Sequence, residues 1–262
     1  MLKLVATDLD GTLLHTDGTV TPRTREVLTA VEDKGVTVVF VTGRPTRWME
    51  HLWVHVGGHG LAVCSNGGIV YDVHARAVSR ARTIPVDVAL EVTRLLREAV
   101  PGTTFAVEKT GGFAKEEGFM PSRPAPEDMQ VGPVTDILDD TAVKLLARHE
   151  EMDPEKFWEE AETQVGHLVT TTWSSTGALV EMSGFGVTKA STLELLCLER
   201  DIVPEEVVAF GDMPNDLPML EWAGTAYAMA NAHPMVRELA DRVAPSNEED
   251  GVAAVLTELF DL

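Results

Sequence analysis

LVATDLDGTLL, residues 4–14, places two acidic side chains directly after an apolar run. Residues 4–6 are typical of a β-strand covered on both faces, and such a strand seldom carries charge. Asp8 and Asp10 stand two positions apart, and side chains two apart in an extended chain point the same way. Two carboxylates at such a short distance require a nearby cation or a shared proton. The stretch therefore predicts a strand that ends in an acidic site.

The composition is that of a folded protein with a strongly acidic surface. Of 262 residues, 44% are hydrophobic and 24% are charged, and both values are near the averages for globular proteins. The chain has 21 basic and 42 acidic residues, a net charge of −21. This charge repels polyanions, so nucleic acid and anionic membranes are not expected as partners. A small phosphorylated substrate would need local positive charge at its site.

The sequence contains no sign of a membrane span or of a signal peptide. No apolar run approaches the roughly 18 residues of a spanning helix, and Asp8 falls where a signal peptide would be apolar. We therefore expect a cytoplasmic protein. Cys64 and Cys197 lack a paired spacing, and we expect both to be buried and reduced.

Strand and helix patterns alternate at both ends of the chain. An apolar run ends at Thr7, residues 21–35 show helical spacing, and residues 36–41 form a β-branched run. Pro45 indicates the start of a further helix. Similar alternation resumes after residue 185. This order predicts an α/β fold with a doubly wound, Rossmann-like parallel sheet.

The middle of the chain differs in character and predicts a separate domain. It is rich in Pro, Gly and acidic residues, with helical patterns at 87–100 and 154–162 and strand-like pieces between them. We expect residues 82–185 to form an inserted α+β cap domain. The core domain would then be discontinuous, comprising residues 1–81 and 186–262.

Polar residues follow four of the predicted strands, in the segments TDLDGT, VTGR, SNGG and FGDMPND. Ligands of open parallel sheets bind at the carboxyl ends of the strands, so these segments predict one crevice. Lys189, at the start of the helix after the insertion, would bring positive charge to it. The strand-end residues expected there are Asp8, Asp10, Thr42, Gly43, Asn66, Asp212, Asn215 and Asp216.

Other nucleotide and metal motifs are excluded by the sequence. The chain has no Gly-Lys dipeptide and hence no Walker A loop, and no G-x-G-x-x-G follows a predicted strand. An EF-hand loop starting at Asp8 would need Gly and Glu where Leu13 and Thr19 stand.

The ordered motifs resemble those of the haloacid-dehalogenase-like hydrolases, specifically the Cof-type phosphatases with a large C2-type cap inserted between the second and third core motifs. The matching segments are DLDGTLL, VTGR, SNGG, GVTKASTLELL, FGDMPNDLPML and AMANAHPMVRELADRVAPSNEEDGVAAVL. The cap resembles the family only in size, position and its exit segment VEMSGFGVTK. Met213 and Pro214 depart from the small or acidic residues usual there, although the spacing from Asp212 to Asn215 and Asp216 is kept.

The resemblance implies a magnesium-dependent phosphatase that acts on small phosphorylated metabolites, sugar phosphates above all. Asp8 would attack phosphorus and become an aspartyl phosphate, and Asp10 would be the general acid and then the base. Magnesium would bind the carboxylates of Asp8 and Asp212 and the backbone carbonyl of Asp10.

The remaining site residues would surround or support the phosphoryl group. Thr12 would brace the carboxylates, and Asp216 would orient Lys189 or a water molecule on the metal. Arg44 and Asn66 are candidates for the pocket lining, although a turn or helix-start role is equally open. The phosphoryl group itself would be held by Leu9, Thr42, Gly43, Lys189 and Asn215.

Two alternatives remain open. A hexose phosphomutase shares the cap type and the aspartyl phosphate, although the short GDMPND segment argues against it. A non-catalytic, metal-binding regulatory domain would not need Asp8, Asp10, Lys189 and Asp212 together. The substrate depends on cap side chains that one sequence does not place.

Overall fold

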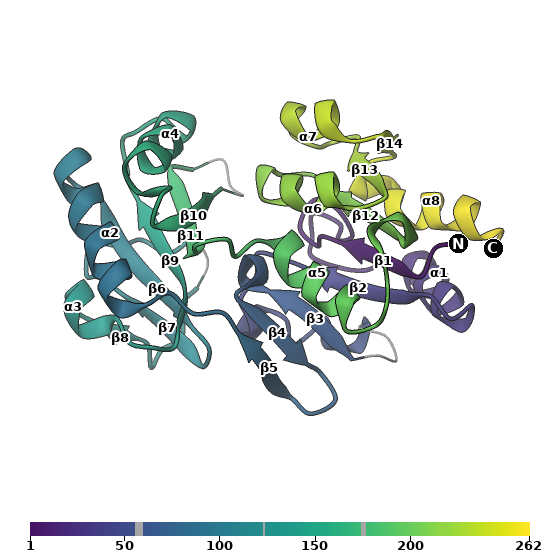
Figure 1. Ribbon diagram of the computed structural model, residues 1–262, viewed down its shortest axis with the longest axis horizontal. Helices are drawn as coiled ribbons and strands as arrows, with labels where there is room; N and C mark the ends of the chain where they lie inside the picture. The colour runs from purple at the N-terminus through teal and green to yellow at the C-terminus, as the bar shows by residue number, and fades with distance from the viewer. Residues whose placement is uncertain (56–59, 123, 174–176) are drawn as a thin grey trace. The chain divides into compact units, whose positions relative to one another are not determined.

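The computed structural model describes residues 1–55, 60–122, 124–173 and 177–262. The chain divides into two compact units. Unit 1 comprises residues 1–79 and 188–262, and unit 2 comprises residues 80–187. Unit 2 is therefore inserted into the sequence of unit 1, and the elements of each are labelled in Figure 1.

Unit 1 is built on a mixed sheet whose strands follow the order β14-β13-β12-β1-β2-β3-β4-β5 in the described part of the chain. The pairs from β14 to β3 are parallel, and β3 and β4 are antiparallel. The expectation of an α/β parallel-sheet core is confirmed, with an antiparallel edge that it did not include. The strands are β1 (Leu4–Thr7), β2 (Thr37–Val41), β3 (Leu61–Cys64), β4 (Ile69–Asp72), β5 (Ala77–Ala81), β12 (Val207–Gly211), β13 (Thr225–Met229) and β14 (Arg242–Ala244).

The register of the central strands brings the polar segments together. In β1, Thr7 pairs with Phe40 of β2 on one side and with Phe210 of β12 on the other. Because the three strands run in parallel and end at the same level, the segments that follow them start side by side. The loops after β1, β2 and β12 therefore meet at one edge of the sheet.

Most helices of unit 1 begin where the sequence supplies a capping residue. Thr21 caps one helix by accepting a hydrogen bond from the Thr24 amide, and Pro22 takes the first position. Thr188 and Ser191 form a capping box at the start of another. The helices are α1 (Pro22–Asp33), α5 (Lys189–Leu198), α6 (Leu217–Trp222), α7 (Pro234–Leu239) and α8 (Gly251–Phe260).

The α-helix predicted after Pro45 is wrong. Two short 3₁₀ turns, Thr46–Trp48 and Trp53–His55, occupy the segment instead. Met49 and Leu52, which lie between the two turns, are almost completely buried, so packing of these side chains accompanies the interrupted helix.

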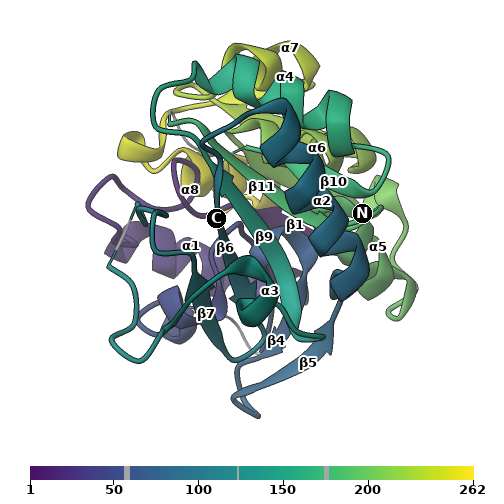
Figure 2. The ribbon, with the colours of Figure 1, turned by 90° about the vertical axis from the view of Figure 1, so that its left-hand side faces the viewer.

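Unit 2 is an α+β arrangement with its own core. Its helices α2 (Val86–Ala99), α3 (Val134–Ile137) and α4 (Pro154–Val165) pack on one face of a sheet, as Figure 2 shows. No described helix of either unit is long and apolar enough to cross a membrane. The strands, in sheet order, are β10 (Val169–Thr172), β11 (Leu179–Gly184), β9 (Ala142–Arg148), β6 (Thr104–Lys109), β7 (Gly112–Lys115) and β8 (Gln130–Val131).

Phe157→Ala should destabilise unit 2. The Phe157 ring is fully buried in its hydrophobic core, so its removal leaves a cavity, and the free energy of unfolding should fall by about 3–5 kcal/mol. Urea unfolding followed by tryptophan fluorescence, to which Trp158 contributes, measures the change. Phe185→Ala is the control, because that ring is 71% exposed. Equal stability of the two variants would contradict the assigned core.

Candidate active site

A buried lysine lies between two carboxylates at the end of β1. The Nζ atom of Lys189 donates to Asp8 Oδ1 and to Asp216 Oδ1, at 2.6 Å in each case. Lys189 and Asp216 are fully buried, and Asp8 is 5% exposed. The capping box places Lys189 at the first position of α5. An ammonium group out of contact with water thus binds carboxylates that follow two adjacent strands.

Asp212 joins this group through the loop that follows Asp8. Thr12 Oγ1 donates to Asp212 Oδ1 at 2.6 Å. Gly11 has φ of +78°, and a Cβ atom there would lie 2.3 Å from Asp212 Oδ2. Glycine is therefore required at this position, both for its backbone conformation and for the close approach of the carboxylate.

Asp8, Asp212 and Asp216 form a cluster with the chemistry of a cation site. Each offers a carboxylate oxygen, and these oxygens lie within 4.8 Å of one another. A set of oxygen donors suits a hard divalent cation. These three side chains could therefore hold such an ion.

The carboxyl groups of Asp8 and Asp212 have raised pKa values, and burial is the largest cause. Burial raises the pKa of Asp8 well above its usual range, against the opposing effect of Lys189, and Asp216 and Asp212 raise it further. Burial, followed by the charge of Asp216, raises the pKa of Asp212 to about 7. Burial alone would lower the pKa of Lys189, but Asp216 and Asp8 together raise it. One ammonium does not balance three carboxylates, so a further cation would be favoured.

Asp216 connects the cluster to the backbone of its own loop. Its Oδ2 atom accepts hydrogen bonds from the amides of Asp212 at 3.0 Å and Met213 at 3.1 Å. Pro214–Asp216 forms a 3₁₀ turn. Met213 and Pro214, which differ from the residues usual at these positions, are thus accommodated in a loop that the Asp216 carboxylate stabilises.

Asp10 does not belong to the cluster of Asp8, Asp212 and Asp216 and is bound by Arg44. The guanidinium donates from Nε to Asp10 Oδ2 and from Nη2 to Asp10 Oδ1, both at 2.6 Å. The Arg44 side chain is 5% exposed and that of Asp10 is 46% exposed. The Arg44 amide also donates to Thr42 Oγ1 at 3.1 Å. The sequence left the role of Arg44 open, and the structure places it against Asp10.

Asn66 and Asn215 meet beside Gly43. Asn215 Nδ2 donates to Asn66 Oδ1 at 3.1 Å, and a Cβ atom on Gly43 would lie 3.0 Å from that same Asn66 oxygen. Asn66 has φ of +55°, a left-handed conformation that asparagine tolerates better than most residues. Asn215 Oδ1 is buried without a hydrogen-bond partner in the part of the chain described. This unpaired oxygen suits a pocket that receives a polar ligand.

The turn after Asp8 is organised around the Leu9 carbonyl. It accepts hydrogen bonds from the amides of Thr12, Leu13 and Leu14 at 3.2, 3.1 and 2.9 Å. The Leu9 side chain is fully buried. These hydrogen bonds form the turn that places the Thr12 hydroxyl beside Asp212.

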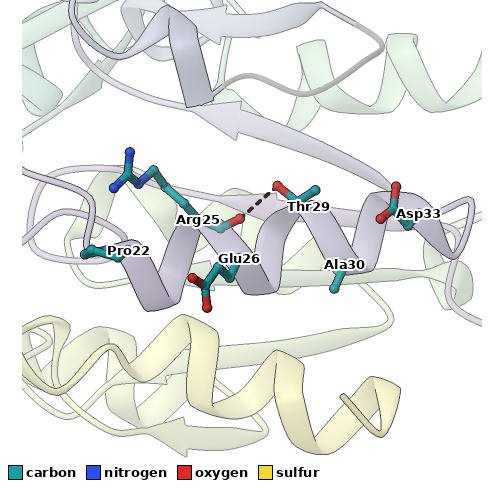
Figure 3. A pocket seen from close by; sticks show the side chains of 6 residues that line it. All are labelled: Pro22, Arg25, Glu26, Thr29, Ala30 and Asp33. Atoms are coloured by element: carbon teal, nitrogen blue, oxygen red, sulfur yellow. Dashed lines mark hydrogen bonds between the residues drawn. The ribbon is translucent and has the colours of Figure 1, made fainter.

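A separate groove of about 380 Å³ runs along α1 and does not coincide with the acidic cluster. Figure 3 shows its lining. Every lining residue belongs to α1, and none is a predicted site residue. They are Pro22, Arg25, Glu26, Thr29, Ala30 and Asp33.

Sequence reasoning missed Asn231 as a residue of this site. Its Nδ2 atom donates to the Gly11 carbonyl oxygen at 2.8 Å. Asn231 follows β13 by two positions, so the strand-end rule that selected Asn66 would also have selected it. β13 pairs with β12. The rule was applied up to β12 and holds for the next strand of the sheet as well.

Lys189→Met should destabilise the metal-free protein. Asp8 and Asp216 would remain buried without their ammonium partner, and the free energy of unfolding should fall by about 3–5 kcal/mol. Urea unfolding at neutral pH measures the loss, and Mg²⁺ should restore part of it. Lys3→Met is the control, because the Lys3 side chain is 50% exposed and pairs with Glu206 at the surface. A Lys189 variant as stable as the Lys3 variant would rule out a buried ion pair.

Comparison with known proteins gives a consistent result along the whole chain. A family model described as haloacid dehalogenase-like hydrolase matches residues 5–256. A 5-amino-6-(5-phospho-D-ribitylamino)uracil phosphatase of Bacillus subtilis is 29% identical, over 99% of this chain and 98% of the relative. A pyridoxal phosphate phosphatase of Escherichia coli is also 29% identical, over 96% of each.

Solved structures share the fold. A protein from Streptococcus mutans superposes with a TM-score of 0.85 at 21% identity, over 100% of both chains. A haloacid dehalogenase-like hydrolase from B. subtilis gives 0.82 at 23% identity, over 99% of this chain and 100% of the other. The resemblance seen in the sequence motifs is confirmed. The chain is therefore a hydrolase of the haloacid dehalogenase-like family.

Proposed function

We propose that this chain is a magnesium-dependent phosphatase that hydrolyses small phosphorylated metabolites through an aspartyl phosphate on Asp8. One observation carries the proposal: the buried Lys189 ammonium lies 2.6 Å from Asp8, and Asp212 belongs to the same carboxylate cluster. Phosphoryl transfer needs a positioned nucleophile and positive charge around the phosphoryl oxygens. Asp8 is positioned by Lys189, and the Lys189 ammonium supplies local positive charge beside it.

The donor set of the site fits magnesium. The carboxylates of Asp8 and Asp212 and the backbone carbonyl of Asp10 would hold the ion, because oxygen donors are the ligands that magnesium prefers. When bound, it would neutralise charge on the phosphoryl oxygens. Asp216, whose oxygens already accept from Lys189 and from two amides, would serve as a support.

The positions of the other residues assign each of them a role in the reaction. Asp8 attacks phosphorus while Lys189 fixes its carboxylate. Both oxygens of Asp10 accept from Arg44, so Asp10 must turn away from the guanidinium to protonate the leaving oxygen. It then takes a proton from the water that hydrolyses the aspartyl phosphate. The phosphoryl oxygens would be held by the Leu9 and Gly43 amides, the Thr42 hydroxyl, Lys189 and Asn215.

The names of the curated relatives define the substrates to test first. They include phosphatases named for a ribitylaminouracil phosphate, pyridoxal phosphate and phosphoglycolate. All are small phosphate esters, which supports a small phosphorylated metabolite as substrate, with sugar phosphates included in the class. A screen of these esters with Mg²⁺, measuring released phosphate, tests the proposal, and no turnover of any ester would refute it.

Asp8→Asn should abolish hydrolysis, because an amide cannot form the acyl phosphate. Turnover with Mg²⁺ should fall on the order of 10⁴-fold or more, and acid-quenched protein should carry no phosphate from labelled substrate. Asp33→Asn, on the α1 groove, is the control and should retain full turnover. Chelation of the metal should silence the wild-type enzyme until Mg²⁺ is restored. Undiminished activity of purified Asp8→Asn protein would eliminate Asp8 as the nucleophile.

Asp10→Asn should slow turnover in a way that depends on the leaving group. Loss of the general acid should reduce alkyl phosphate hydrolysis by about 10²–10⁴-fold. An aryl phosphate such as p-nitrophenyl phosphate leaves without a proton, so its first half-reaction should be spared. Rapid-quench measurement should then show a burst of nitrophenol followed by slow release of phosphate. Equal losses for both esters in the first half-reaction would argue against Asp10 as the general acid.

A further inference from the structure

The side chain of Asn231 bridges two segments that are distant in sequence. Its Nδ2 atom donates to the Gly11 carbonyl oxygen at 2.8 Å, and its Oδ1 atom accepts from the Asn247 amide at 3.1 Å. Since an amide N–H can only donate, the bond from Asn247 fixes the carboxamide with its oxygen toward residue 247. The NH₂ group is thereby directed at Gly11.

The loop that carries Asn231 also holds the loop of Asp212. The amide of His233 donates to the Asp212 carbonyl oxygen at 2.8 Å. Residues 231 and 233, just beyond the end of β13, therefore bind both the segment after β1 and the segment after β12. One short loop thus fixes the position of Gly11 relative to Asp212.

Gly11 is the point at which such a restraint matters most. It has no side chain to limit its backbone, and its φ of +78° is one that glycine leaves readily. The peptide that Asn231 holds joins Gly11 to Thr12, whose hydroxyl donates to Asp212 Oδ1 at 2.6 Å. Rotation of this peptide would move the Thr12 hydroxyl and release the Asp212 carboxylate.

Asn247 strengthens the same arrangement from the C-terminal part of the chain. Its Nδ2 atom donates to the Leu14 carbonyl oxygen at 2.9 Å, and the residue is 7% exposed. Together, Asn231 and Asn247 bind two carbonyl oxygens of the loop that begins at the nucleophile. That loop is therefore held at both ends of its turn.

We propose that Asn231 is a positioning residue of the cation site. By fixing the Gly11–Thr12 peptide against the loop of Asp212, it keeps the Asp212 carboxylate in the orientation that binds the divalent ion. The inference rests on the proposed magnesium-dependent function. It concerns binding of the ion, which is measurable without any substrate.

Calorimetric titration of Mg²⁺ into purified protein, without substrate, tests the role directly. Asn231→Ala loses both hydrogen bonds, and Asn231→Asp keeps the acceptor for Asn247 but loses the donor to Gly11. Both should bind Mg²⁺ about 10-fold more weakly than wild type. The added charge of Asn231→Asp would by itself tighten cation binding, so weaker binding by that variant would be due to loss of the donor that faces the Gly11 carbonyl oxygen.

Activity measurements distinguish loss of a positioning role of Asn231 from a general loss of catalytic activity. Both variants should need a higher Mg²⁺ concentration for half-maximal turnover, while the KM for the phosphate ester at saturating Mg²⁺ stays unchanged. Asp17→Asn is the matched control. Asp17 lies in the same loop but accepts only local bonds from Thr19 among those the structure gives it, and its substitution should leave Mg²⁺ binding unchanged.

The outcomes distinguish this inference from the function on which it rests. Wild-type protein that binds Mg²⁺ and hydrolyses esters, alongside Asn231 variants of unchanged Mg²⁺ affinity, would overturn the inference alone. Wild-type protein that binds no Mg²⁺ would overturn the proposed function, and the inference with it. Since Asn231 is exposed, both variants should keep the wild-type unfolding midpoint, and a weaker affinity at an equal midpoint supports positioning.

Discussion

The ammonium group of Lys189 is the interaction on which the acidic site depends. Each carboxylate at the end of β1 or β12 loses hydration on burial, and together they repel one another. Lys189 offsets part of this unfavourable energy by binding Asp8 and Asp216 at once. The pKa of Asp212 is nevertheless raised to about 7, first because the group is buried and then because of the charge of Asp216. The excess of carboxylates over ammonium groups gives the cluster affinity for a cation.

Much of unit 1 was predictable because its strands are buried on both faces. Continuous apolar runs identified β1, β2 and β12, and the strand-end rule then brought Asp8 and Asp212 into one group. Lys189 was added as the first residue of the helix after the insertion. The missed strands lack that signal. In β5 the residues alternate between exposed and half-buried, and β14 has only three residues. Short or half-solvated strands depend on their neighbours for stability, so their own residues do not predict a strand.

The partners of the site residues were harder to predict than their identities. Arg44 stands 34 positions from Asp10, and Asn231 stands 220 positions from Gly11. The residue types indicated hydrogen-bonding capacity, but which groups meet depends on loop conformations such as the positive φ of Gly11. Conformations of that kind arise from the packing of several strands, so a single segment does not encode them.

The place of β1 in its sheet affects how the chain folds during synthesis. β1 pairs with β2, which follows within about thirty residues, and with β12, which begins at Val207. Until β12 leaves the ribosome, one edge of an apolar strand has no native partner and is open to pairing with other chains. The contiguous unit 2, residues 80–187, can assemble its sheet during that interval. Asp8, the proposed nucleophile, is thus translated well before Asp212 and Asp216, which complete its surroundings.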